Sequence, residues 1–290
     1  MNSYKVSLVA LLLATLALTS CRNETASSRE VIVASIAPVK YIVEQIVGDD
    51  IPIEVLVPAG VSPETFDPSP KQLIEINEAR AIMSVGLIDF EKSILKRLGD
   101  KSRLIDLSAG VELLAGSCSH DHSGTHHHHD HGVDPHIWTS PRELEVMALN
   151  CYNAIANLYP DSLHYKENYI TLQSRLKRLD LDISAQLIAS DIKSFVIYHP
   201  AYTYFARAYG IEQVAVEEDG KDPSARRLGE IIDLAREQRI HGVLYQTQFP
   251  SSAVAVIAQD IGVEAVAVDP LAENIIEHIE EFANIICAQQ

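Results

Sequence analysis

The stretch that decides the fold is DSLHYKENYITLQSRLKRLDLDISAQLIAS, residues 161–190, which contains neither Gly nor Pro. Its apolar side chains recur every three or four residues, a spacing that places them on one face of an α-helix. They are Tyr165, Tyr169, Leu172, Leu176, Leu179, Ile183 and Leu187. At 1.5 Å per residue such a helix extends roughly 45 Å, long enough to connect two lobes. We therefore predict a stiff connecting helix over residues 160–190.

On both sides of this stretch, short β-branched runs alternate with helical patterns. The runs cover residues 31–37, 53–57, 81–85 and 104–107 before it, and 195–198, 213–216, 242–245 and 263–268 after it. This alternation is typical of βα units and a mainly parallel sheet. We predict an α/β fold with two similar lobes, residues 31–159 and 191–290, each a mainly parallel sheet flanked by helices.

Histidines gather in the second half of the first lobe. Residues 118–138 hold eight of the twelve histidines, and a tract this dense is typical of metal binding. An affinity tag or a solvated polar loop is the alternative interpretation. We predict a His-rich loop over residues 118–132 whose side chains are auxiliary metal ligands. They are His120, His122, His126, His127, His128, His129 and His131.

Four further residues stand at predicted strand ends or in the loops that follow them. In α/β sheets, ligands bind beyond the carboxyl ends of the strands. Glu64 and His136 belong to the first lobe, and His199 and Asp269 to the second. Two imidazoles and two carboxylates can hold and neutralise a divalent cation, so we predict a metal site between the lobes.

Smaller features surround these four residues. Ser140, Pro141 and Glu143 predict the N-cap, first turn and capping-box partner of a helix just after His136. Gln246 and Gln248 follow a predicted strand and are candidates for hydrogen bonds near the site. Core or surface roles fit these two residues equally well.

Four motifs resemble those of the zinc/manganese solute-binding proteins of ABC transporters. The motifs are residues 60–68, GVSPETFDP, residues 134–138, DPHIW, residues 199–205, HPAYTYF, with Tyr209 and Gly210, and residues 269–271, DPL. They occur in the family's order across nearly the whole chain, with a His-rich insertion before the second. The resemblance implies a metal held between two lobes joined by a rigid helix and delivered to an ABC permease. It assigns ligand roles to His136, His199 and Asp269.

The first motif departs from the family, which places histidine where this chain has Glu64. Either Glu64 supplies an oxygen ligand, or water or a histidine of the tract occupies that coordination position. We favour Glu64 because a carboxylate is a competent donor. Two nitrogens and two oxygens suit Zn²⁺ and also admit Mn²⁺ or Fe²⁺, and the His tract favours zinc.

The N-terminus is typical of an exported protein. Lys5 precedes an apolar run, residues 6–18, which is too short for an ordinary membrane span. Leu-Thr-Ser-Cys, residues 18–21, resembles the lipobox of bacterial lipoproteins. We predict a signal peptide over residues 1–20, a lipid on Cys21 that anchors the chain to a membrane, and a polar tether over residues 21–30. The alternative is an ordinary secretory signal with an incidental cysteine.

The amino-acid composition limits the kinds of partner that the protein can bind. A net charge of −17 argues against nucleic acid, and 47% hydrophobic residues among 290 supply a substantial core. Beyond Cys21, three widely spaced cysteines do not form a disulfide framework. Cys118 is a candidate thiolate ligand beside the tract, and Cys151 fits an apolar helix pattern and a core position.

The favoured function is a lipid-anchored, monomeric receptor in the bacterial periplasm or on the cell surface, which captures zinc for an ABC importer. The chain contains no His-Glu-x-x-His motif and no Ser or Cys nucleophile signature, so we expect no enzyme. A metal-buffering or adhesive surface lipoprotein, in which the tract itself is the functional element, is the remaining alternative.

Overall fold

The computed structural model describes residues 29–116, 132–218, 221–249 and 252–288. The predicted signal peptide, Cys21, Cys118 and all seven tract histidines lie outside these residues. The predicted tether ends earlier than expected, because Arg29 already begins the first strand. Among the described residues, no helix combines the length and apolar character that crossing a membrane requires.

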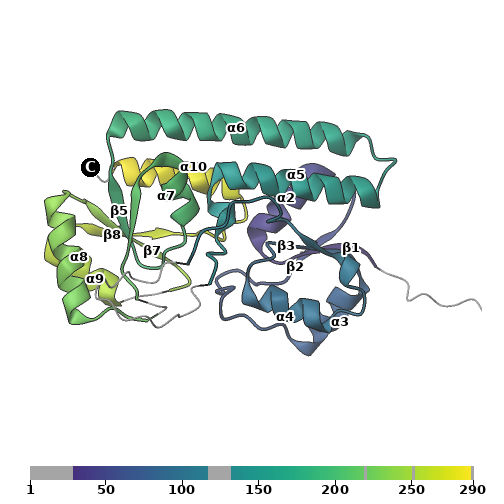
Figure 1. Ribbon diagram of the computed structural model, residues 1–290, viewed down its shortest axis with the longest axis horizontal. Coiled ribbons are helices and arrows are strands. Elements are labelled where there is room, and N and C mark those ends of the chain that lie inside the picture. The colour runs from purple at the N-terminus through teal and green to yellow at the C-terminus, as the bar shows by residue number, and fades with distance from the viewer. Residues whose placement is uncertain (1–28, 117–131, 219–220, 250–251, 289–290) are drawn as a thin grey trace, which may run out of the picture.

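The first lobe is built on a parallel sheet with the strand order β2-β1-β3-β4. Its strands are β1 (Arg29–Ala34), β2 (Ile53–Val55), β3 (Ala79–Ser84) and β4 (Leu104–Asp106). Three helices connect them, α2 (Ala37–Val47), α3 (Pro70–Glu78) and α4 (Asp89–Arg97). In Figure 1, α2 lies on one side of the sheet, and α3 and α4 lie on the other. All four predicted strands of this lobe are therefore confirmed.

The second lobe repeats this plan, with a parallel sheet in the order β6-β5-β7-β8. Its strands are β5 (Ser194–Ile197), β6 (Glu212–Ala215), β7 (Gly242–Gln246) and β8 (Glu264–Val268). The helices are α7 (Thr203–Tyr209), α8 (Ala225–Glu237), α9 (Ser252–Ile261) and α10 (Ile275–Ala288). Strand β5 is buried along its whole length because helices cover both faces of the sheet. The predicted α/β class with two similar lobes is confirmed.

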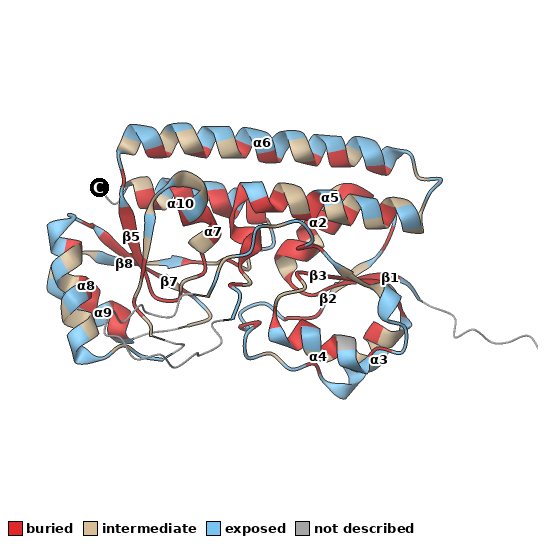
Figure 2. Ribbon diagram, viewed as in Figure 1, coloured by how far each residue is buried: buried red, intermediate tan, exposed pale blue. Residues whose placement is uncertain are grey.

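The connecting helix is α6 (His164–Ser190), 27 residues long. Its buried side chains are the seven members of the predicted stripe, so the periodicity identified the packed face correctly. Figures 1 and 2 show α6 running along one side of both lobes with its exposed face turned outward. It packs against α2 and α10, and against α5 (Pro141–Leu158). One helix therefore stiffens both lobes.

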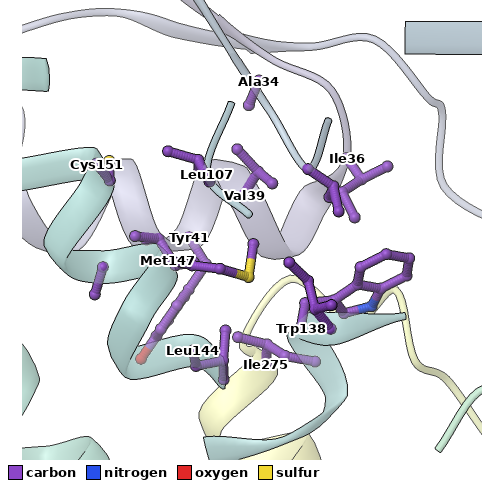
Figure 3. Close-up of a cluster of buried hydrophobic side chains, with 14 of the residues drawn as sticks. Ala34, Ile36, Val39, Tyr41, Leu107, Trp138, Leu144, Met147, Cys151 and Ile275 are labelled. Atoms are coloured by element: carbon purple, nitrogen blue, oxygen red, sulfur yellow. The ribbon is translucent and has the colours of Figure 1, made fainter. Parts of the chain in front are cut away.

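The core of the first lobe continues into the second. Figure 3 shows Ile275, from α10 of the second lobe, beside Trp138, Leu144 and Met147 of the first. Cys151 is fully buried in the same core, as predicted, and its burial raises the pKa of the thiol. A smaller separate core lies beneath α8 and α9. Because one hydrophobic core spans the boundary between the lobes, the packing holds the two lobes in a fixed relative orientation.

The predicted capping box at the start of α5 is wrong. Ser140 is the N-cap and Pro141 occupies the first turn, but the Ser140 side chain accepts no capping hydrogen bond. The Glu143 carboxylate instead accepts a hydrogen bond of 2.6 Å from the guanidinium of Arg207, on α7. A charge-assisted bond to a guanidinium competes well with a backbone N–H, so Glu143 joins the two lobes in place of capping its own helix.

Candidate metal centre

The site forms where loops from the carboxyl ends of strands in both lobes meet. Glu64 lies in the loop after β2, His136 in the loop after β4, and His199 two residues beyond the end of β5. One ligand atom from each of these side chains lies within 4.8 Å of the other two. Within the described residues this is the one such group of His, Cys, Asp and Glu side chains. The structure thus brings together three of the four predicted ligands.

The three donor atoms face a common point. The Nε2 atoms of His136 and His199 are 3.3 Å apart. Glu64 Oε1 lies 3.3 Å from His199 Nε2 and 3.9 Å from His136 Nε2. Two neutral imidazoles that both turn an unshared electron pair toward one point repel each other unless a proton or a cation lies between them. The arrangement therefore suits a positively charged occupant.

Asp134 holds the His136 ring in place. Its Oδ1 atom lies 2.8 Å from His136 Nδ1 and also accepts the His136 backbone N–H at 2.9 Å. Burial raises the pKa of Asp134, but the charge and hydrogen bonds of His136 outweigh it and leave the pKa below its ordinary value. An ionised Asp134 keeps the proton of His136 on Nδ1, so Nε2 is free to bind a metal.

Glu217 takes the same role for His199. Its Oε1 atom lies 2.9 Å from His199 Nδ1. The buried amide of Gln246 accepts the His199 backbone N–H at 3.2 Å and donates to its carbonyl oxygen at 2.6 Å. Phe249 stacks on the imidazole with the ring centroids 4.7 Å apart. Both the backbone and the ring of His199 are therefore held.

Charges around the site favour a cation at His199. Burial opposes protonation of this ring and is the largest single influence on it. Hydrogen bonds and charges from Glu217 and Glu64 outweigh burial and raise the pKa of His199 to about 9. The same carboxylates that favour a proton on this ring also favour a divalent metal ion in its place.

Glu64 is the exposed member of the group. Its side chain is 38% exposed, whereas those of His136 and His199 are each 7% exposed. Burial raises its pKa, but the hydrogen bond to His199 and the charges of both histidines outweigh it, so the pKa of Glu64 lies below its ordinary value. Phe66, two residues later, packs edge-on against Phe90 of α4 and anchors the loop. Glu64 is thus ionised at neutral pH on the open side of the site.

Asp269, the fourth predicted ligand, does not join this group. Its Oδ1 atom accepts hydrogen bonds from Gln248 Nε2 at 2.7 Å and from the Leu271 backbone N–H at 3.0 Å. It lines a different cavity, beside His278. Gln248 therefore hydrogen-bonds a predicted ligand, as its position suggested, and Asp269 as a ligand remains a prediction.

Hydrogen bonds between the lobes surround the site. Trp138 Nε1 donates to the Pro270 carbonyl at 2.8 Å, and Thr139 Oγ1 donates to the Ala201 carbonyl at 2.9 Å. Tyr204 Oη donates to the Asp134 carbonyl at 2.8 Å. These buried bonds tie the loop that carries His136 to the second lobe. The two histidines are therefore held at a fixed separation.

The cavity at the site reaches the base of the His-rich segment. This cavity of about 230 Å³ is lined by Glu64, His136, His199 and Glu217, and also by Gly116 and Gly132. Gly116 N donates to Gly132 O at 2.6 Å, and a Cβ at Gly116 would lie 2.9 Å from that oxygen. Glycine permits this close approach, so Gly116 and Gly132 lie side by side at the rim of the site.

Sequence reasoning missed Asp134 and Glu217. Asp134 was visible as the first residue of the motif DPHIW, two positions before a predicted ligand, where a carboxylate can reach the histidine ring. Glu217 follows the predicted strand 213–216 directly and so occupies the same kind of position as the predicted ligands. Its pairing with His199, 18 residues away, required the three-dimensional fold.

Comparison with known proteins extends these findings. The model of the family described as zinc-uptake complex component A periplasmic, ZnuA, matches residues 32–286. The crystal structure of a ZnuA deletion mutant with zinc bound is 32% identical, with a TM-score of 0.80, covering 89% of this chain and 97% of the other.

Curated relatives from streptococci are also similar. The zinc-binding protein AdcA of Streptococcus pyogenes serotype M3 is 29% identical over 88% of this chain and 53% of its own length. The zinc-binding lipoprotein AdcA of Streptococcus pneumoniae serotype 4 is 28% identical over 92% of this chain and 55% of its own. The chain therefore spans about half the length of these two relatives.

Proposed function

The chain belongs to the ZnuA family of zinc-uptake complex components, and from this premise we propose that it captures a divalent metal ion for an ABC-type importer. One observation carries the proposal, the convergence of two carboxylate-anchored histidine Nε2 atoms with Glu64 within 4.8 Å. Carboxylate–histidine–metal arrangements are a recurring design of zinc sites. The role is binding and delivery, not catalysis.

We propose zinc as the ion, held by Glu64, His136 and His199. Two nitrogens and one oxygen suit Zn²⁺, and zinc is bound in the similar ZnuA structure. The carboxylate also admits Mn²⁺ or Fe²⁺ as alternatives within the same family. Asp269 is the proposed fourth donor. Its Oδ1 atom accepts a hydrogen bond from Gln248, so its second oxygen would be the donor to the metal.

We also propose where the protein acts. A lipid on Cys21 would anchor it outside the cytoplasm, and the similarity to a streptococcal zinc-binding lipoprotein supports this. The seven tract histidines would then collect metal beside the site, because Gly116 and Gly132 line the same cavity as the ligands. The protein would act as a monomer, and it would deliver the metal to the permease of a metal importer.

Metal analysis of the purified protein tests the proposal. The mature chain, loaded with zinc and dialysed, should retain one tightly held ion, and His136→Ala and His199→Ala should each lose it. His241→Ala, which removes an exposed histidine far from the site in sequence, is the matched control and should retain the ion. Undiminished zinc in both site variants would refute the proposal. Loss of all tight binding after deletion of residues 118–132 would favour metal buffering by the tract.

A further inference from the structure

The two histidines of the site obtain their carboxylate partners in different ways. Asp134 lies two residues before His136 in the same loop, whereas Glu217 lies 18 residues beyond His199, after a different strand. We propose that Glu217 is a positioning residue that sets the metal affinity of the site by fixing the His199 ring and the proton on its Nδ1. This inference rests on the proposed function.

The placement of Glu217 requires a reason beyond stability. Its side chain is 8% exposed, and its ion-pair partner among the described residues is His199. Burial of a carboxylate that has no Arg or Lys partner costs free energy. For Glu217, the hydrogen bond from the Nδ1–H of His199 offsets this cost, and a cation bound at Nε2 would strengthen that bond. The Glu217 backbone N–H donates to the Tyr198 carbonyl at 3.1 Å, which ties it to the residue before His199.

The other contacts of His199 do not replace Glu217. Gln246 binds only the backbone of His199, and Phe249 contacts the face of the ring. Neither acts on Nδ1, so neither determines which ring nitrogen carries the proton. Among the described residues the partner of Nδ1 is Glu217. Without Glu217, the His199 ring can rotate about its Cβ–Cγ bond, or it can carry its proton on Nε2. A proton on Nε2 blocks metal binding there.

Glu217 also adds charge to the site without being a ligand. Glu64, Asp134 and Glu217 together surround the two imidazoles with three carboxylates. A hydrogen bond to a carboxylate makes the imidazole a stronger donor toward the metal. Glu217 should therefore strengthen binding both by orienting His199 and by raising its basicity.

The test measures zinc affinity by competition with a chromophoric chelator for three variants. Glu217→Ala should weaken zinc binding about 10- to 100-fold, the usual effect of losing a carboxylate behind a ligand histidine. Glu217→Gln keeps a hydrogen-bond acceptor for Nδ1 but loses the charge, so it should recover part of the loss and bind more tightly than Glu217→Ala. Glu218→Gln removes the same charge one residue away, where the carboxylate contacts the Ser224 backbone, and should match the wild type.

A spectroscopic signature separates positioning from a general loss of structure. In ¹⁵N NMR of the zinc-loaded wild type, the His199 ring should show a proton on Nδ1 and zinc on Nε2. Glu217→Ala should lose that fixed pattern while His136 retains it. If Glu217→Ala does not fold, Glu217→Gln decides the matter, because the wild-type ring pattern must persist in it.

Two outcomes are distinguishable. Glu217→Ala with the zinc affinity of Glu218→Gln would overturn this inference and leave the proposed function intact, provided His136→Ala still loses zinc. A His136→Ala variant that retains zinc as tightly as the wild type would instead refute the proposed function.

Discussion

The two lobes share a strand order but contribute to the site in unlike ways. The first lobe supplies one tightly held proposed ligand, His136, and one exposed proposed ligand, Glu64. The second lobe supplies His199, whose backbone, ring face and Nδ1 are all held by other residues. The same topology therefore gives a fixed pair of nitrogens and one more exposed carboxylate oxygen.

The strongest test of this comparison removes one histidine from each lobe. His136→Ala and His199→Ala should weaken zinc binding equally, by about 1,000-fold or more, which corresponds to roughly 4 kcal/mol. The expectation of equality follows because both rings are buried and each is anchored by a carboxylate. Isothermal titration with zinc gives the measurement. A much smaller loss in one variant would show that one lobe holds the ion alone.

The second lobe contains a buried histidine, His278, that lines a different cavity from the candidate site. His278 Nε2 lies 2.7 Å from Tyr202 Oη. Burial lowers the pKa of His278 from 6.5 to about 4, and the charge of Asp269 only partly opposes this. The folded state therefore binds fewer protons than the unfolded state between these values. The resulting stabilisation is complete above pH 6.5 and is lost as the pH falls toward 4.

This shift gives a stability prediction. The unfolding free energy of metal-free protein should fall by up to about 3 kcal/mol between pH 6.5 and 4 on account of His278. His278→Gln does not titrate, yet it offers Tyr202 an acceptor, so its stability should depend less on pH over that interval. Urea unfolding at several pH values checks this. Identical pH profiles for the two proteins would contradict a neutral His278.

Substitutions of Glu64 test the difference between the exposed proposed ligand and the two buried histidines. Glu64→Ala should weaken zinc binding about 10- to 100-fold, less than loss of either histidine, since an exposed carboxylate is easily replaced by water. Glu64→His replaces the oxygen donor with a nitrogen donor and should raise the preference for Zn²⁺ over Mn²⁺, because nitrogen donors favour zinc. Competition between the two metals measures it. An unchanged preference would argue against Glu64 as a ligand.

Asp269 should give the smallest effect. The hydrogen bonds from Gln248 and the Leu271 backbone both fall on Oδ1. The Gln248 amide therefore competes with a metal for the charge of the carboxylate, but it does not occupy the second oxygen. We expect Asp269→Asn to weaken zinc binding by about tenfold or less, the cost of one weakly engaged donor. Gln248→Ala frees the carboxylate and serves as the paired variant. It should bind zinc at least as tightly as the wild type, and weaker binding would contradict this competition.

The fold and the three side chains that meet at the site could be predicted from the sequence. The same physical reasons explain why other contacts could not. Strands buried on both faces and the stripe on α6 leave clear periodic patterns, and strand-end positions locate Glu64, His136 and His199. Pairings between distant residues leave no such pattern. Glu217 with His199, and Glu143 with Arg207 in place of a capping box, depend on how the lobes meet.

The most direct test of the central claim is anomalous diffraction at the zinc edge from crystals of the zinc-loaded protein. We predict one strong peak between the lobes, about 2.0–2.2 Å from Nε2 of His136, Nε2 of His199 and a carboxylate oxygen of Glu64. Asp134 and Glu217 should remain on the Nδ1 atoms. A peak away from the two histidines, or none between the lobes, would contradict the account.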